Sequence, residues 1–257
     1  MLSGKKGLTL VASIMLIVFA SIAVLGVTTF IVERFRQYNV DQLGAKCIYL
    51  AQAGVNNAAY FFRLHDAAAN GYFTLGQTNL NAQNFFILGS SAADALMVNT
   101  SVSALGGTKS RDSLGLTIQN AVNSKTITID RMVVTWNSSA TLTAISINGA
   151  SVWTGNASSP ANADITNFTL NTTPTIYSVN YIRFSGTMTG ATISVQFIMT
   201  DGSSKTLTVY PASQNYNFTV KATGQTSNSN IYRTIQAVYN ALTAKIIDCD
   251  EISARAQ

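Results

Sequence analysis

The residues that could carry out chemistry are few in this chain of 257 residues. It has one histidine, His65, and two cysteines, Cys47 and Cys249. A multi-histidine metal site and a Ser-His-Asp arrangement both need more than His65 offers, and His65 lies where we expect a helix to end. We therefore predict that the chain is not an enzyme and carries no metal or cofactor.

Two short segments resemble ligand-binding loops without having their spacing. Residues 105–110, Leu-Gly-Gly-Thr-Lys-Ser, lack the first glycine that a phosphate-binding loop requires. Residues 201–204, Asp-Gly-Ser-Ser, are more typical of a hairpin turn than of a calcium loop. We interpret both segments as turns.

The two cysteines lie near opposite ends of the part that follows the apolar N-terminal run. In an oxidising compartment Cys47 and Cys249 could form one disulfide that ties the tail to the N-terminal helix. They could instead be a pair of unrelated buried thiols, because cysteine is among the residue types most often buried. Both alternatives are open at this point.

The N-terminal region carries a long uncharged run, and the rest of the chain is attached to it. Leu8 to Val32 contain no charged residue, and a helix of about 25 residues spans a bilayer core of about 30 Å. The run is too long for the apolar core of a secretory signal peptide. Lys5 and Lys6 precede it, which predicts a cytoplasmic N-terminus and an exported bulk. Helical sequence continues to Leu64, so we predict one long helical rod over residues 8–64.

The start of this rod carries a family resemblance. The string Lys6-Gly7-Leu8-Thr9-Leu10-Val11 resembles the prepilin peptidase site of type IV pilins, where a basic leader ends in glycine. The resemblance implies that residues 1–7 are a leader and that processing cuts between Gly7 and Leu8. Two positions depart from the family pattern. Leu8 replaces the usual phenylalanine, and Ala12 replaces the glutamate that pairs with a neighbouring subunit's N-terminal amine.

A second stretch strengthens the resemblance. Residues 45–58, Ala-Lys-Cys-Ile-Tyr-Leu-Ala-Gln-Ala-Gly-Val-Asn-Asn-Ala, are similar to a segment of PilX-like minor pilins and related pseudopilins. Those relatives often lack the early glutamate as well. The resemblance implies a structural filament subunit, and Ala12 favours a minor or tip subunit within that class.

The composition after the rod points to an exported protein. Charged residues are only 11% of the chain, and the net charge of +5 is scattered, so we predict no nucleic-acid partner. Threonine, serine and asparagine are abundant after Leu64, as in β-rich surface proteins. We expect residues 65–125 to be a connecting region of the head.

Alternating apolar and polar residues predict a β-sandwich over residues 126–212, with Trp136 and Trp153 as packing residues rather than sugar platforms. Its expected strands are Thr126–Trp136, Leu142–Ile147, Ile176–Phe184, Ile193–Met199 and Leu207–Tyr210. Residues 213–257 should form a hairpin and tail. By the family resemblance, the hairpin of Asn217–Gly224 and Ile231–Tyr239 belongs to the sheet that packs on the rod.

The predicted fold class is α+β, a long N-terminal helical rod with a β-rich head that includes a sandwich. The predicted function is a structural subunit of a type IV pilus-like filament that polymerises through the apolar helix. The expected filament-core residues are Leu10, Val11, Ala12, Ile14, Leu16, Ile17, Phe19, Ile22, Leu25 and Gly26.

The expected partners before assembly are lipid of the cytoplasmic membrane and the prepilin peptidase. After assembly, copies of the chain or other pilin subunits would contact the helix in an extracellular filament at the cell surface. The alternative is a membrane-anchored sandwich that serves adhesion or binding and does not polymerise.

Overall fold

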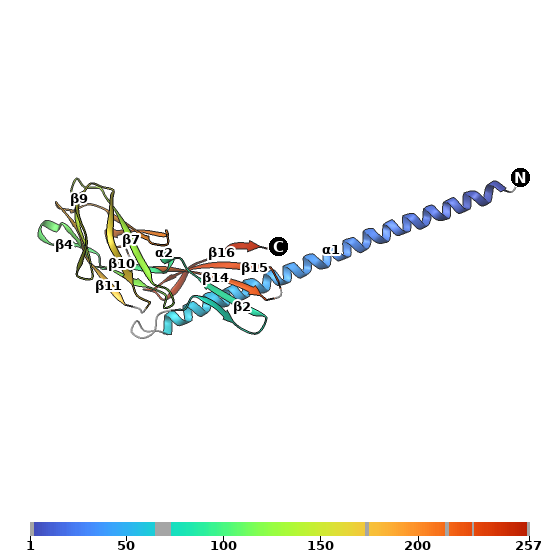
Figure 1. Ribbon diagram of the computed structural model, residues 1–257, viewed down its shortest axis with the longest axis horizontal. Coiled ribbons are helices and arrows are strands. Elements are labelled where there is room, and N and C mark those ends of the chain that lie inside the picture. Colours follow the sequence, from blue (N-terminus) through green and yellow to red (C-terminus); the bar gives the residue numbers. More distant parts are fainter. Residues whose placement is uncertain (1–2, 65–72, 173–174, 214–215, 228, 256–257) are drawn as a thin grey trace.

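The computed structural model describes residues 3–64, 73–172, 175–213, 216–227 and 229–255, with residues 3–9, 64 and 253–255 as backbone only. A single helix, α1 (Ser3–Leu64), forms a rod of 62 residues, which is about 93 Å at the helical rise. Its N-terminal half extends free of the rest of the protein (Figure 1). A sheet-rich head follows, so the α+β class is consistent with the structure. His65 and the helix end expected at residues 65–71 lie outside the described residues.

The rod packs against a five-stranded antiparallel sheet, which we call the head sheet. Its strand order is β1-β2-β14-β15-β16. The strands are β1 (Gly76–Asn79), β2 (Asn84–Gly89), β14 (Asn217–Thr226), β15 (Tyr232–Asn240) and β16 (Lys245–Arg255). The hairpin expected near the C-terminus is present as β14 and β15, while β16 adds a strand where we expected a tail.

Small residues let the rod lie close to this sheet. Cys47, Ala51, Gly54 and Ala58 recur at helical spacing and are buried, and this stripe falls within the second pilin-like motif. A Cβ atom on Gly54 would lie 2.9 Å from Cδ2 of Phe86, so only glycine fits there without a shift. Burial along β14 alternates strictly, which directs every second side chain toward the rod.

Aromatic rings close the core at the distal end of the rod. Phe62 of α1 packs on Phe218 and Tyr239, with ring centroids 4.9 and 4.6 Å away. Phe73 stacks on Phe218 at 5.5 Å. Such ring pairs add to the burial of large apolar surfaces, and they fix the distal end of the rod in the head.

The rest of the head is a sandwich of two antiparallel sheets. One has the order β10-β7-β12-β13, and the other the order β3-β6-β11-β5-β4, with β8 paired to β11 and β9 to β8. The strands are β3 (Leu96–Asn99), β4 (Ala104–Gly106), β5 (Asp112–Leu114), β6 (Leu116–Asn120), β7 (Ile127–Trp136), β8 (Leu142–Ile147), β9 (Ala150–Ala157), β10 (Ala161–Leu170), β11 (Ile176–Phe184), β12 (Ile193–Met199) and β13 (Ser204–Tyr210).

Side chains from both sheets meet in one core. Trp136 of β7 is 5% exposed and lies edge-on to Phe184 of β11 at 5.0 Å, as expected of a packing residue. Phe168 of β10 meets Tyr177 of β11 at 5.3 Å. Trp153 is only partly buried. Figure 1 shows the sandwich at the end of the molecule far from the free half of the rod.

The boundary expected between connecting region and sandwich at residue 126 differs from the structure. Strands β3 to β6, at 96–120, pair within the sandwich sheet that contains β11. Strands β1 and β2 belong instead to the head sheet. The expected connecting region is therefore divided between the two, because long-range pairing with β11 and β14 decides where such short strands belong.

A polar latch joins the sandwich to the head sheet. The short helix α2 (Ala92–Ala95) follows β2, and its first amides donate to Asp201 Oδ2 and Ser203 Oγ of the β12–β13 turn, both at 2.9 Å. Lys125 Nζ lies 3.3 Å from the same Asp201 oxygen. Lys205 Nζ donates to the backbone carbonyls of Leu96 and Asn217. These contacts fix the sandwich where the chain leaves and re-enters the head sheet.

Candidate assembly surface

The free half of the rod is an uncovered apolar surface. Every side chain from Leu10 to Val32 is exposed, with values from 46% at Ile31 to 72% at Leu16 among the large apolar residues. This segment belongs to a helix long and apolar enough to cross a membrane. A helix that is apolar on all sides is stable only where lipid or other protein surrounds it.

The expected filament-core residues all lie on this surface. The structure brings none of them against another described part of the chain, since Leu10, Val11, Ala12, Ile14, Leu16, Ile17, Phe19, Ile22, Leu25 and Gly26 are exposed. Gly7 and Leu8 lie within α1 as backbone, and their side chains are outside the described residues. Whatever covers this surface must come from outside the chain as the structure describes it.

Three hydroxyl groups of the apolar half are satisfied within the helix. Ser21 donates to the carbonyl of Ile17 at 2.8 Å, Thr28 to Val24 at 2.7 Å and Thr29 to Leu25 at 2.8 Å. An unpaired hydroxyl in an apolar medium costs about 2–7 kcal/mol. Because each of these hydroxyls bonds one turn back, the segment can enter a medium without water at little polar cost.

Small side chains break the surface of the apolar half at two places. Ala20 and Ser21 form a shallow depression edged by larger aliphatic residues such as Leu16 and Leu25. A Cβ atom added to Gly26 would meet nothing within 4 Å. Small residues allow two helices to approach closely when hydrocarbon surrounds both, since packing rather than water exclusion then holds them together.

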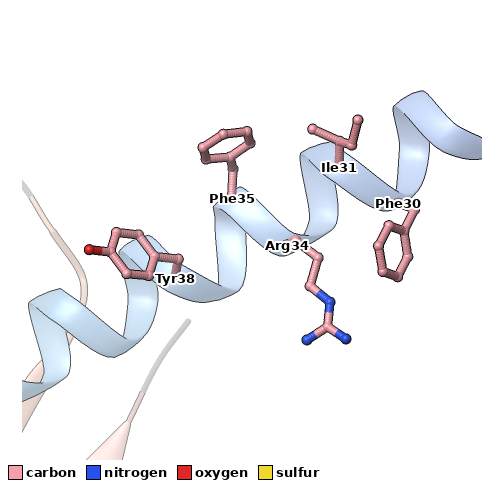
Figure 2. Close-up of a pocket in the computed structure, with 5 residues that line it drawn as sticks. All are labelled: Phe30, Ile31, Arg34, Phe35 and Tyr38. Atoms are coloured by element: carbon pink, nitrogen blue, oxygen red, sulfur yellow. The ribbon is translucent and has the colours of Figure 1, made fainter.

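A cluster of aromatic residues with one arginine marks the end of the apolar half. This aromatic cluster consists of Phe30, Ile31, Arg34, Phe35 and Tyr38. Figure 2 shows Ile31 and Phe35 on one side of the helix, with Phe30 and Arg34 directed away from them. The Arg34 Cζ atom lies 5.2 Å from the centroid of the Phe30 ring, a cation–π distance.

The aromatic cluster was not predicted from the sequence. Aromatic and arginine residues gather where membrane-spanning helices meet the headgroup region, because their polar tips reach water while their rings stay in apolar surroundings. The signal was present as Phe30, Phe35 and Tyr38 on either side of Val32, with Arg34 among them. Aromatic and arginine residues at the end of an apolar run are the pattern by which a sequence reveals such a cluster.

The disulfide considered for Cys47 and Cys249 is absent, and both thiols are free. Cys47 is buried between the rod and the head sheet, where its Sγ donates to the carbonyl of Ile231 at 3.3 Å. Cys249 lies exposed on β16, in register with Ala237. Burial raises the pKa of Cys47, and both burial and the neighbouring Asp250 and Asp248 raise the pKa of Cys249.

The segments that resemble ligand loops are turns. Residues 105–110 lead from β4 into a single 3-10 turn, where Lys109 and Ser110 have positive φ values of 59° and 50°. Asp201 and Gly202 close the β12–β13 hairpin, and the Asp201 carboxylate is occupied by the latch. Among the described residues, no group of three or more His, Cys, Asp or Glu side chains could hold a metal ion.

Comparisons with protein families, with curated proteins and with solved structures find no match to this chain. The exposure, charge and course of the rod are therefore the observations from which a function can be inferred.

Proposed function

We propose that this protein is a structural subunit of a type IV pilus-like filament, held in the membrane by the apolar half of its rod and polymerised through the same surface. The processing site at Gly7 and Leu8 and the motif at residues 45–58 suggest this class. The single observation that carries it is a helix whose one half is uncovered and apolar and whose other half is built into the head.

The continuity of the rod favours an assembly role over a simple tether. A domain that is only displayed on a membrane needs an anchor of about 20 apolar residues, and any flexible linker can join the domain to that anchor. Here α1 continues without interruption from Leu10 through exposed residues such as Gln37 to the buried stripe that begins at Cys47. The head is thus held at a fixed direction to the apolar half, as regular packing of subunits in a filament requires.

The burial free energy of the apolar half also suits its transfer from lipid into a bundle of protein helices. Burying a valine, leucine, isoleucine or phenylalanine contributes about 1.5–3 kcal/mol relative to water, so a bare rod does not persist in solution. The same burial gains little relative to lipid tails. Close packing at Ala20, Ser21 and Gly26 would then supply part of the gain on assembly.

Ala12 favours a minor or tip position in such a filament. The apolar half contains no acidic residue that could pair with an incoming N-terminal amine, since Glu33 is the first acid of the chain. A subunit at the tip needs no such pairing toward one side. The sandwich, at the end of the molecule farthest from the free half of the rod, would then be the most accessible part for adhesion.

The test compares two glycines of the leader. In Gly7→Ala cells we expect the chain to keep residues 1–7, seen by intact mass, and filaments containing it to disappear from sheared surface material. Gly4→Ala, which changes the leader away from the cut site, should be processed and assembled normally.

An uncut N-terminus in the unaltered chain, together with no filaments in its sheared fraction, would instead support the membrane-anchored binding protein. Normal processing and assembly of the Gly7→Ala chain would also contradict the proposal.

A further inference from the structure

Arg34 is the first cation that follows the apolar half of the rod, and its charge has no acidic partner. The side chain is exposed, and none of the ion pairs between described residues includes it. Its guanidinium lies beside the Phe30 ring, and Figure 2 shows the tip of the side chain reaching away from the helix. A guanidinium has five N–H donors and no acceptor. The described part of the chain leaves these donors to an external group.

The other arginine of this region lies on a different side of the helix. Because a helix turns about 100° per residue, Arg36 points about 160° away from Arg34. Arg36 shares a shallow depression with Glu33 and Asp41, whereas the aromatic cluster around Arg34 contains no acid. Two carboxylates attract the Arg36 guanidinium and repel an anionic ligand. Arg34 is therefore the cation that is available to an anion at this level of the rod.

The depth of Arg34 in a bilayer follows from the length of the apolar half. Leu10 to Val32 form about 34 Å of helix, slightly more than the hydrocarbon core of about 30 Å. When the core is centred on this run, its edge falls near Ile31. Arg34 then lies about 4–5 Å further along the rod, within the headgroup layer that adds about 5–7 Å on each side of the core.

We propose that Arg34 binds the phosphate of a phospholipid in the leaflet on the side of the head. The charges are complementary, and the site continues the apolar surface that lipid covers. A guanidinium suits a phosphate because two parallel N–H groups can donate to two of its oxygens. The Phe30 and Phe35 rings would lie at the upper end of the acyl chains. This contact rests on the membrane insertion within the proposed function, and it names the lipid group that fixes the depth of the rod.

Tyr38 agrees with this placement. It lies one turn beyond Arg34, and its hydroxyl accepts a hydrogen bond from Gln42 at 2.6 Å. Tyrosine is enriched at this level of membrane-spanning helices, because its ring stays in apolar surroundings while its hydroxyl reaches water. The order Phe30, Arg34, Tyr38 therefore runs from the acyl chains through the phosphates to water.

A direct test detects arginine carbon close to lipid phosphorus. The full chain, with ¹³C at the Cζ atom of its eight arginines, is reconstituted in phosphatidylcholine bilayers in a buffer free of phosphate. Rotational-echo double-resonance NMR then measures how much of the Cζ signal is dephased by ³¹P. We expect about one eighth of the signal to be dephased, because one arginine of the eight contacts phosphate.

Two matched variants assign the signal. Arg34→Lys keeps the positive charge, so the chain should insert as before, but the dephased signal should fall about tenfold because the guanidinium carbon is gone. Arg36→Lys should keep the dephased signal. The unaltered chain in dodecyl maltoside micelles, with inorganic phosphate in the buffer, should show no dephasing, which separates lipid phosphate from free phosphate.

Three outcomes would overturn the lipid contact. They are no dephased arginine in the unaltered chain, an equal loss in both variants, and dephasing by inorganic phosphate in micelles. Each would leave the proposed filament standing, because these samples contain unassembled chain. Failure of the chain to sediment with the vesicles would overturn both the contact and membrane insertion. Loss of the filament proposal through the Gly7→Ala test would not alter the NMR result.

Discussion

Gly224 of β14 lies directly against the backbone of the rod at Cys47. A Cβ atom on Gly224 would overlap the carbonyl oxygen of Cys47 and would lie 2.6 Å from the amide nitrogen of Ala51. Backbone atoms within a helix cannot move aside as a flexible side chain can. The distance between rod and head sheet is therefore set by the missing side chain at this position.

Gly224→Ala should separate the head sheet from the rod. We expect a loss of about 1–3 kcal/mol in the free energy of unfolding, the usual cost of forcing extra volume into a packed core. Urea unfolding of the detergent-solubilised chain measures it. Gly89→Ala on neighbouring β2 is the control, because its Cβ would meet nothing closer than 4.0 Å. Equal stability of the two variants would show that the rod can shift to make room.

Asp201 should make the latch sensitive to acid. Burial alone would raise its pKa, but hydrogen bonds from the Ser203 hydroxyl, from the amides of Ala92 and Ser203 and from Lys125 lower it to about 2. A carboxylate with a lowered folded-state pKa stabilises the fold above its ordinary value of 3.8, and that contribution is lost as the pH falls through about 2.

Asp201→Asn should remove this part of the pH dependence. Urea unfolding at a series of pH values from about 6 down to about 2 should show a smaller loss of stability below pH 4 in the variant than in the unaltered chain. The loss of the charged contacts should appear as a lower stability of the variant at the upper end of the series. If the free energies of unfolding of the two chains fall in parallel in the acid range, Asp201 does not contribute to the pH dependence of stability.

Lys205 should have a distinct effect at alkaline pH. Burial lowers its pKa from 10.5 to about 8, against the attraction of Asp94. The unfolded chain therefore binds more protons than the folded chain between these two values, and stability should rise as the pH increases through this window. Lys205→Met should abolish that rise in denaturant unfolding measured across the same range. At neutral pH the variant also reports the loss of two hydrogen bonds to backbone carbonyls, those of Leu96 and Asn217.

The two thiols should react at very different rates. Native chain in detergent should take up one maleimide per molecule, at exposed Cys249, and a second only after denaturation releases Cys47. Intact mass spectrometry counts the labels. The Cys249→Ser variant should take up none while folded. A native chain that resists labelling at both positions, and that migrates more slowly in a gel after reduction, would be evidence for a disulfide between Cys47 and Cys249.

Much of the fold could be predicted from local sequence. The bounds of β8, β11 and β12 match the segments Leu142–Ile147, Ile176–Phe184 and Ile193–Met199, since large apolar residues alternate with polar ones there. β10 was not predicted because two of its inward positions are Ala161 and Ala163, whose side chains are too small to make the alternation visible. β3 to β6 have three to five residues each, and they are assembled on β11, which is distant in sequence.

The candidate assembly surface, like the fold, could be predicted from the sequence only in part. The exposed apolar half could be predicted because lack of charge over a long run depends on nothing else in the fold. The exposure of Ile247 and Ile252 on β16 could not be predicted, because it depends on where the rod ends across the sheet. Whether Cys47 and Cys249 pair could not be decided for a related reason. Spacing along the chain says nothing about the buried environment that encloses Cys47 alone.

The order of strands in the head sheet determines when the rod can be covered. β2 and β14 are neighbours, yet the whole sandwich sequence lies between Gly89 and Asn217. Contacts between residues so far apart form late, since a long loop must close before any pairing stabilises it. During synthesis the buried stripe of the rod therefore stays uncovered until β14 and β15 have been made and can pack on it.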